Sequence, residues 1–154
     1  MRYFVLLIGA VLISSCSQNF GSVPATVSQQ NLVTRLSNPG PSISKVSKID
    51  TKQKQKIVIS GRGFGTMQPY NGDSEYLQIW DITGGWSAGL DNISQDDTVT
   101  LNVTSWSDSK IDVAGFTGGW GEYNWTLQKG DHLTINVWNP QTDSGPATAH
   151  KKVK

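Results

Sequence analysis

The sequence predicts an all-β fold, a sandwich of two antiparallel sheets with about seven strands. Apolar and polar residues alternate over several short runs, the connections between the runs are rich in Gly, Asn, Asp and Pro, and no stretch of the domain has helical spacing. Strands of this kind bury one face against a second sheet. A small barrel is the alternative that the same pattern allows.

The first fifteen residues are typical of a secretory signal peptide. Arg2 precedes an apolar run over 5–13, and small residues follow at 14–15. The run is shorter than the roughly 20 residues that a helix needs to cross a bilayer. We therefore expect residues 1–15 to be removed.

The residues around the expected cut, Ile13-Ser14-Ser15-Cys16, resemble the lipobox of bacterial lipoproteins. The resemblance implies that Cys16 is lipidated and that the lipid anchors the chain in the cell envelope. Because Ser17 follows and not aspartate, it also implies sorting to the outer membrane in a Gram-negative host. The alternative is an ordinary signal peptide that happens to contain a cysteine. Cys16 is the only cysteine, which excludes a disulfide within one chain.

Residues 16–41 are predicted to be the lipidated N-terminus and a flexible tether, because they are rich in small and polar residues and carry one charge, at Arg35. Residues 42–154 have the length of one compact domain. Without the signal peptide, twelve Lys and Arg balance twelve Asp and Glu, which argues against nucleic-acid binding. Lysines gather at the start of the domain, where they indicate a solvated edge strand and turn. They are Lys45, Lys48, Lys52, Lys54 and Lys56.

The first half of the domain contains three predicted strands. A weak one covers 43–49, and a second centres on Ile57 and Ile59. The second strand ends in a glycine-rich turn, 61–65, in which Phe64 is expected to point inward and cap the core. The third strand, 76–82, is partly apolar on both faces, which places it centrally in its sheet or beneath a covering loop.

The second half contains four more. The runs 98–104 and 132–138 alternate with a period of two, and their apolar odd-numbered residues face inward. A shorter run contains Ile111 and Val113, and a weak strand covers 147–153. The inward residues of the two longer runs are Val99, Leu101, Val103, Leu133, Ile135 and Val137.

Three segments occur in a recognisable order: a strand with a Gly-Phe-Gly turn at 57–65, a polar turn leading into a strand at 104–113, and a final hairpin beginning at 130–140. Together they resemble the IPT/TIG family over residues 41–153. The resemblance implies an immunoglobulin-like β-sandwich that serves as an interaction module, and it implies no catalytic residues. Long connections at 65–75, 83–97 and 116–127 depart from the family pattern.

Two of these connections repeat one tetrapeptide, Thr83-Gly84-Gly85-Trp86 and Thr117-Gly118-Gly119-Trp120, in a domain that contains six tryptophans. One hypothesis is a ligand platform on which aromatic rings stack while polar neighbours bind hydroxyls. The alternative is that the loops fold back over a sheet and their rings form a satellite core. The candidate stacking residues are Trp86, Trp120, Tyr123 and Trp125, and the candidate polar residues are Asp91, Asn92, Glu122 and Asn124.

We therefore expect a non-catalytic binding module for a protein or envelope component. A carbohydrate-binding lipoprotein and a structural envelope protein are the alternatives. The spacing of Ser, His and acidic residues suggests no catalytic triad, and no motif marks a glycosidase carboxylate pair, so no enzyme is expected. The acidic residues lack EF-hand spacing, and neither a metal nor another cofactor is expected.

Overall fold

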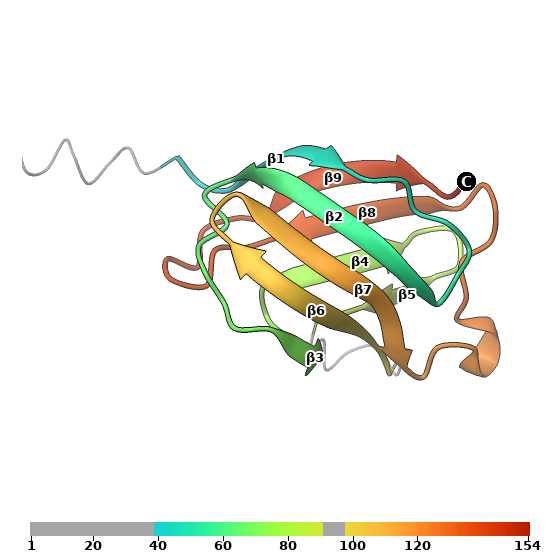
Figure 1. Cartoon of the computed structure of the whole chain (residues 1–154). Helices are drawn as coiled ribbons and strands as arrows, with labels where there is room; N and C mark the ends of the chain where they lie inside the picture. The colour runs from blue at the N-terminus through green and yellow to red at the C-terminus, as the bar shows by residue number, and fades with distance from the viewer. Residues whose placement is uncertain (1–38, 91–97) are drawn as a thin grey trace, which may run out of the picture. The chain divides into compact units, whose positions relative to one another are not determined.

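Two antiparallel sheets lie face to face in the computed structural model, which describes residues 39–90 and 98–154 (Figure 1). The all-β sandwich predicted from the sequence is therefore confirmed, and the barrel alternative is not observed. The predicted signal peptide, Cys16 and residues 16–38 of the tether lie outside the described residues. No helix in the described part of the chain is long and apolar enough to span a membrane.

One sheet has five strands and the other has four. The first runs in the order β1 (Ser42–Val46), β2 (Lys54–Arg62), β7 (Lys110–Gly118), β6 (Val99–Ser107) and β3 (Tyr70–Gly72). The second runs β5 (Trp86–Ala88), β4 (Leu77–Asp81), β8 (His132–Val137) and β9 (Ala147–Lys152). Among the described residues, the helical part is one 3₁₀ turn, η1 (Glu122–Asn124).

All seven predicted strands are present, and two short ones add to them. The additions, β3 and β5, have three residues each and come from the long connections after Gly65 and Asp81. Strand β3 pairs with β6, where Asn71 lies opposite Asn102. Strand β5 pairs with β4, where Ser87 lies opposite Trp80. Three residues are too few for a period of two to be read from the sequence.

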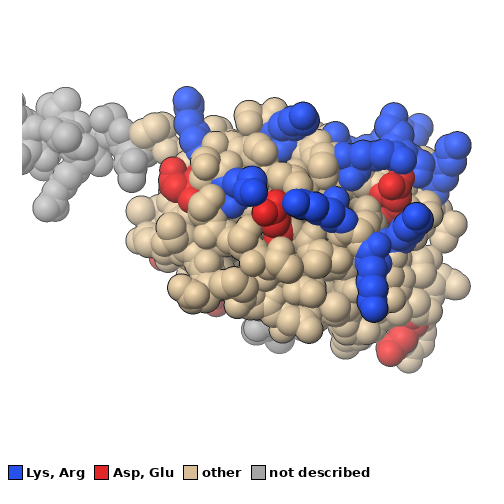
Figure 2. All heavy atoms as spheres, in the orientation of Figure 1, with Lys and Arg blue, Asp and Glu red and all other residues tan. Residues whose placement is uncertain are grey.

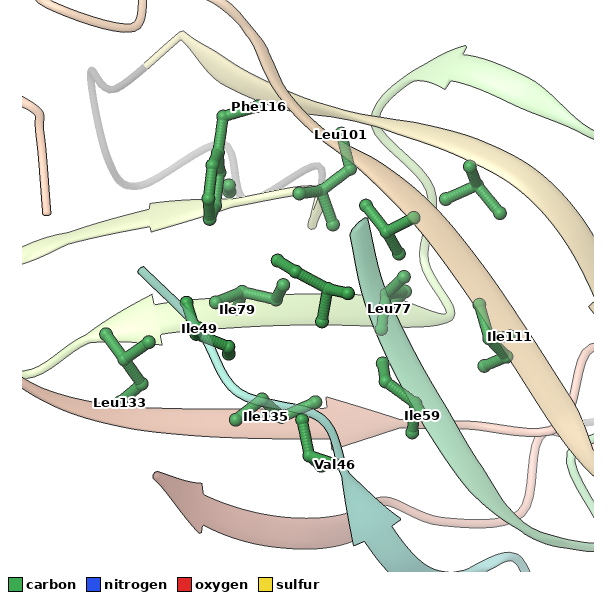
Figure 3. Packing of buried hydrophobic residues seen from close by; sticks show 14 of the residues in the cluster. Val46, Ile49, Ile59, Leu77, Ile79, Leu101, Ile111, Phe116, Leu133 and Ile135 are labelled. Atoms are coloured by element: carbon green, nitrogen blue, oxygen red, sulfur yellow. The ribbon is translucent and has the colours of Figure 1, made fainter. Parts of the chain in front are cut away.

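The core follows the alternation of the longer strands (Figure 3). The odd-numbered residues of β8 and of the first half of β6 are buried, as predicted, and they meet Ile57 and Ile59 of β2 in one cluster. Each aliphatic side chain that is removed from water in this way contributes about 1.5–3 kcal/mol before the entropy of ordering is subtracted. The two layers therefore stabilise one another through a single continuous core.

Strand β6 changes its inward positions part-way along. Register shifts occur between Leu101 and Val103 and between Val103 and Ser105. Such bulges alter which side chains face the core, and Trp106 is buried although it falls on the other parity from Val103. The indole N–H of Trp106 donates a hydrogen bond of 3.0 Å to the Phe64 carbonyl oxygen.

The glycine-rich turn after β2 is held by hydrogen bonds to two other connections. Gly63 and Gly65 adopt φ of 70° and 68°, and Phe64 is fully buried, as predicted. The Asp108 carboxylate accepts hydrogen bonds from the N–H groups of Gly63 and Gly65. On the other side, the Gln141 side chain bonds both the N–H and the C=O of Thr66. This turn therefore joins three connections at one end of the sandwich.

Two further expectations have mixed outcomes. The five lysines near the start of the domain are all exposed, but Lys54 and Lys56 lie on β2, which is an interior strand and not an edge. Strand β4 lies between β5 and β8, as its two apolar faces suggested. Its outer face is partly open to solvent, since Trp80 is 38% exposed.

Candidate functional site

The two Thr-Gly-Gly-Trp segments converge on one another. The Trp86 ring meets Trp120 edge to face at a centroid distance of 5.7 Å, and it meets Phe116 in the same manner at 6.0 Å. Phe116 and Trp120 are stacked, with centroids 4.6 Å apart. We call these three residues the ring cluster. Pairs with these geometries contribute about 0.5–1.5 kcal/mol beyond the area that they bury.

The glycines of the repeat allow this close packing. Gly118 has φ of 62°, and a Cβ there would lie 2.2 Å from the Thr98 carbonyl oxygen. A Cβ at Gly84 would lie 2.7 Å from the Trp86 indole nitrogen. A larger residue would clash with the Thr98 backbone at Gly118 and with the Trp86 side chain at Gly84. In the second repeat the glycine therefore serves close approach to the backbone of Thr98, and in the first repeat Gly84 leaves room for the buried Trp86 ring.

Two of the four candidate stacking residues, Trp86 and Trp120, belong to the ring cluster. Trp86 is 1% exposed and lies in the core, so the hypothesis that its ring projects toward a ligand is wrong for this residue, and the packing alternative holds. Trp120 is partly buried against the same core. The polar candidates Asp91 and Asn92 lie outside the described residues.

Tyr123 and Trp125 form a second aromatic pair, on the segment that we call the aromatic turn, residues 121–125. The Trp125 ring is partly buried against the core, and the Tyr123 ring is exposed. Tyr123 is 83% exposed, and its ring lies 5.1 Å from the ring of Trp125. Glu122 and Asn124, the remaining polar candidates, are also exposed beside it. The structure thus brings four of the eight candidate residues together on one turn.

The backbone of the aromatic turn is strained. Tyr123 and Asn124 adopt φ of 46° and 69° in the left-handed region. This conformation costs Tyr123 about 1–2 kcal/mol, whereas asparagine adopts it more readily. Backbone hydrogen bonds from Gly121 N–H to the Trp125 carbonyl and from Trp125 N–H to the Glu122 carbonyl hold the turn closed. Strained backbone of this kind clusters at functional positions.

A second aromatic surface lies on the outer face of the four-stranded sheet. Trp80 stands opposite Thr134 of β8, and Thr134 stands opposite His150 of β9. The neighbouring row consists of polar side chains joined across three strands. Asn136 donates a hydrogen bond of 2.9 Å to Gln78, and Thr148 donates one of 2.8 Å to Asn136.

This outer face was not proposed as a site from the sequence, although its pattern was visible there. The alternation over 76–82 and 132–138 placed Trp80, Thr134 and Asn136 away from the core. What the sequence lacked was the strand order that sets β4, β8 and β9 side by side. A flat aromatic ring beside ordered amides and hydroxyls provides one apolar contact and several hydrogen-bonding groups.

Two carboxyl groups lie close together beneath the first repeat. Asp81 is fully buried and accepts hydrogen bonds of 2.9 Å from the N–H groups of Thr83 and Gly84. Burial raises the pKa of the Asp81 carboxyl, the Gly84 and Thr83 N–H groups act against this shift, and the nearby Asp131 carboxyl adds to it. Because both acids are buried and bind loop backbone, the pair orders the turn and offers substrate no access.

The remaining chemistry of the described residues is modest. No group of three or more His, Cys, Asp or Glu side chains is arranged to hold a metal ion in 39–90 and 98–154. His150 contacts Thr134 through Nδ1 at 3.2 Å, and His132 is exposed at the start of β8.

In comparisons with known proteins, no family model, curated protein or solved structure matches this chain. The candidate surfaces are therefore interpreted from their own geometry.

Proposed function

We propose that this protein is a membrane-anchored extracytoplasmic lipoprotein whose β-sandwich is a non-catalytic binding module. The aromatic turn is its principal contact surface. A single observation carries the proposal: Tyr123 is 83% exposed on a turn whose backbone is strained. Exposed aromatic rings are unusually effective in interfaces because they bury a large area with few rotatable bonds.

The anchor in this proposal is Cys16, supported by the apolar run before it and by the lipobox-like residues at the expected cut. Acyl chains at Cys16 would hold the domain at the membrane, because each buried methylene contributes about 0.8 kcal/mol. The IPT/TIG resemblance belongs to the same proposal. It is supported by the buried Phe64 in its Gly-Phe-Gly turn and by the two-sheet architecture.

The anchor is tested by growing a bacterial host that expresses the full chain with a clickable palmitate analogue. Label should appear on the wild-type chain and disappear in Cys16→Ala. Label on both chains, or on neither, contradicts lipidation at this residue.

The contact surface is tested by photo-crosslinking in the same host. A crosslinking residue placed at position 123 should give a discrete adduct, because the Tyr123 side chain is exposed to solvent. Thr142 is a matched control, since it is also exposed and lies in the connection between β8 and β9. Equal adducts at both positions, or none at position 123, would refute a contact role for the turn.

Carbohydrate binding is the second candidate, and the outer face of the four-stranded sheet favours it. Trp80 provides a ring for a sugar face, and the Gln78–Asn136–Thr148 row provides oriented polar groups beside it. A glycan array should then show binding that Trp80→Leu abolishes and Tyr123→Ala leaves intact. Leucine keeps apolar area but lacks a flat ring, so equal binding by Trp80→Leu would argue against stacking.

A further inference from the structure

Lysines from the two ends of the domain meet in one groove. Strand β1 forms the open edge of the five-stranded sheet and β9 the open edge of the four-stranded sheet, and the two strands run near one another. The groove along this seam has a volume of about 480 Å³. We call it the basic groove, and its charged and titratable lining is Lys45, Lys48, His150, Lys151, Lys152 and Lys154.

The lysines of the chain are concentrated in two segments, and five of them line this groove. Segments 45–56 and 151–154 contain eight lysines and one acid, Asp50, whereas the rest of the chain has five basic and eleven acidic residues. Figure 2 shows Lys and Arg side chains gathered over β1, β2 and the end of β9. The balanced total therefore conceals a basic side on an otherwise acidic protein.

Protection of the sheet edges explains only part of this cluster. A lysine on each open edge strand deters edge-to-edge pairing, and Lys45 of β1 and Lys151 of β9 meet that need. Lys48, Lys152 and Lys154 exceed it. Within the described residues, the groove lysine that has an ion-pair partner is Lys48, which lies 2.6 Å from Asp50.

We propose that the basic groove docks the domain onto anionic phospholipid head groups of the membrane that carries its anchor. This inference rests on the proposed lipoprotein function. Lysines act as point charges suited to many diffuse phosphates, whereas arginine would favour a few bidentate contacts. No Phe, Tyr or Trp side chain lines the groove, so it lacks the large aromatic platforms on which the bases of single-stranded nucleic acids stack.

The position of the tether supports the same occupant. Strand β1 begins at Ser42, immediately after the predicted tether, so the chain enters the domain on a strand that forms one wall of the groove. Fully extended, the 25 residues from Ser17 to Pro41 span at most about 90 Å. The anchor thus keeps the groove within reach of the membrane surface, and the acidic remainder of the chain is repelled by that surface.

The test uses the mature chain, residues 16–154, with Cys16→Ser so that no acyl group contributes. Binding is measured by co-sedimentation with vesicles of phosphatidylcholine alone or mixed with phosphatidylglycerol. Binding should require phosphatidylglycerol. It should be lost when salt rises from about 0.01 M to about 1 M, because the Debye length falls from about 30 to about 3 Å.

Two variant pairs separate the groove from net charge. Lys45→Gln with Lys152→Gln removes one lysine from each wall and should weaken vesicle binding roughly 10- to 30-fold, at about 1 kcal/mol per lysine. Arg62→Gln with Lys110→Gln removes the same charge outside the groove and should change binding less than about threefold. All four side chains are exposed, so circular dichroism should show unchanged folding.

Three results would overturn the proposal. They are no binding to phosphatidylglycerol vesicles, equal weakening by both variant pairs, or binding to soluble polyphosphate or heparin without vesicle binding, which would assign the groove to an anionic chain in solution. Because the tested protein has no lipid, these results are independent of the palmitate experiment. Either proposal can fail alone.

Discussion

The indole of Trp106 and the carbonyl of Phe64 are joined by a buried hydrogen bond of 3.0 Å. Phe64 belongs to the turn after β2, and Trp106 belongs to β6, which lies two places away in the same sheet. The bond therefore links the turn after β2 to β6, a strand that is distant from this turn in the sequence. It satisfies a carbonyl that the fully buried Phe64 would otherwise leave without a partner in the core.

Replacing Trp106 with phenylalanine keeps an aromatic ring and removes this bond. The free energy of unfolding should fall by about 1–3 kcal/mol, the cost of an unpaired buried carbonyl. Guanidinium unfolding followed by circular dichroism measures the change. Trp125→Phe, at a partly exposed site, serves as the comparison and should stay within about 0.5 kcal/mol. Equal stability of Trp106→Phe and wild type would show that the bond contributes nothing.

Trp86 and Tyr123 should behave oppositely on truncation. Trp86→Ala removes the centre of the ring cluster and should destabilise the domain by about 3–5 kcal/mol. Tyr123→Ala should change stability by no more than about 0.5 kcal/mol, because its side chain is 83% exposed. Chemical melts measure both values, and acrylamide should quench Trp125 far more than Trp86. Similar losses in the two variants would place Tyr123 in the core and refute its contact role.

The two repeats predict different costs for the same glycine change. Gly118→Ala combines a left-handed φ with a Cβ placed 2.2 Å from the Thr98 carbonyl, so a loss above about 2 kcal/mol is expected. Gly85 has φ of 72°, but a Cβ added there would meet no atom within 4 Å, so Gly85→Ala should lose only the conformational cost of about 1–2 kcal/mol. Thermal melts of the two variants give the ranking. The reverse ranking would contradict the close approach at Gly118.

The buried Asp81 predicts a characteristic dependence of stability on pH. Its pKa is raised in the folded state, so its stabilising contribution is complete below the unfolded value of 3.8 and is lost as pH rises through the folded pKa. The stability of wild type relative to Asp81→Asn should therefore decline with increasing pH across this window. Unfolding free energies measured across that range test it, and a difference that is flat or rises with pH refutes it.

Asp112 provides a control of opposite sign. The hydrogen bond from Lys110 lowers the pKa of Asp112, although partial burial acts against it, and Ser105 adds a second stabilising bond. Its contribution is present above the unfolded value and is lost as pH falls through the folded pKa. Wild type relative to Asp112→Asn should therefore lose stability toward acid. The two difference curves should slope in opposite directions.

Much of the fold was predictable because the longer strands bury one face. In β8 the sequence alone identifies Leu133, Ile135 and Val137 as inward, and the structure buries all three. The bulges in β6 were not predictable, since they depend on pairing with β7, and so Trp106 could not be assigned to the core from its parity. Strand order is a tertiary property, and it decides that residues 80, 134 and 150 share one row.

The candidate site was only partly predictable for a related reason. Glycines beside an aromatic residue allow a ring to project or a backbone to approach, and the sequence does not distinguish these outcomes. The Trp86 ring packs into the core because it lies against Phe116, which is distant in the chain. The Tyr123 ring projects into solvent because its turn pairs with no strand among the described residues. The convergence of lysines from 45–48 and 151–154 likewise required the placement of β1 beside β9.

The ring cluster has an evolutionary consequence. Trp86 and Trp120 come from two copies of one tetrapeptide, and both rings contact Phe116. The two tryptophans therefore fill neighbouring parts of one packed region. A smaller side chain in one copy would leave a void that only a larger one in the other could refill. In divergent descendants of this chain, positions 86 and 120 should therefore covary in size, although they lie in separate segments and carry the same residue here.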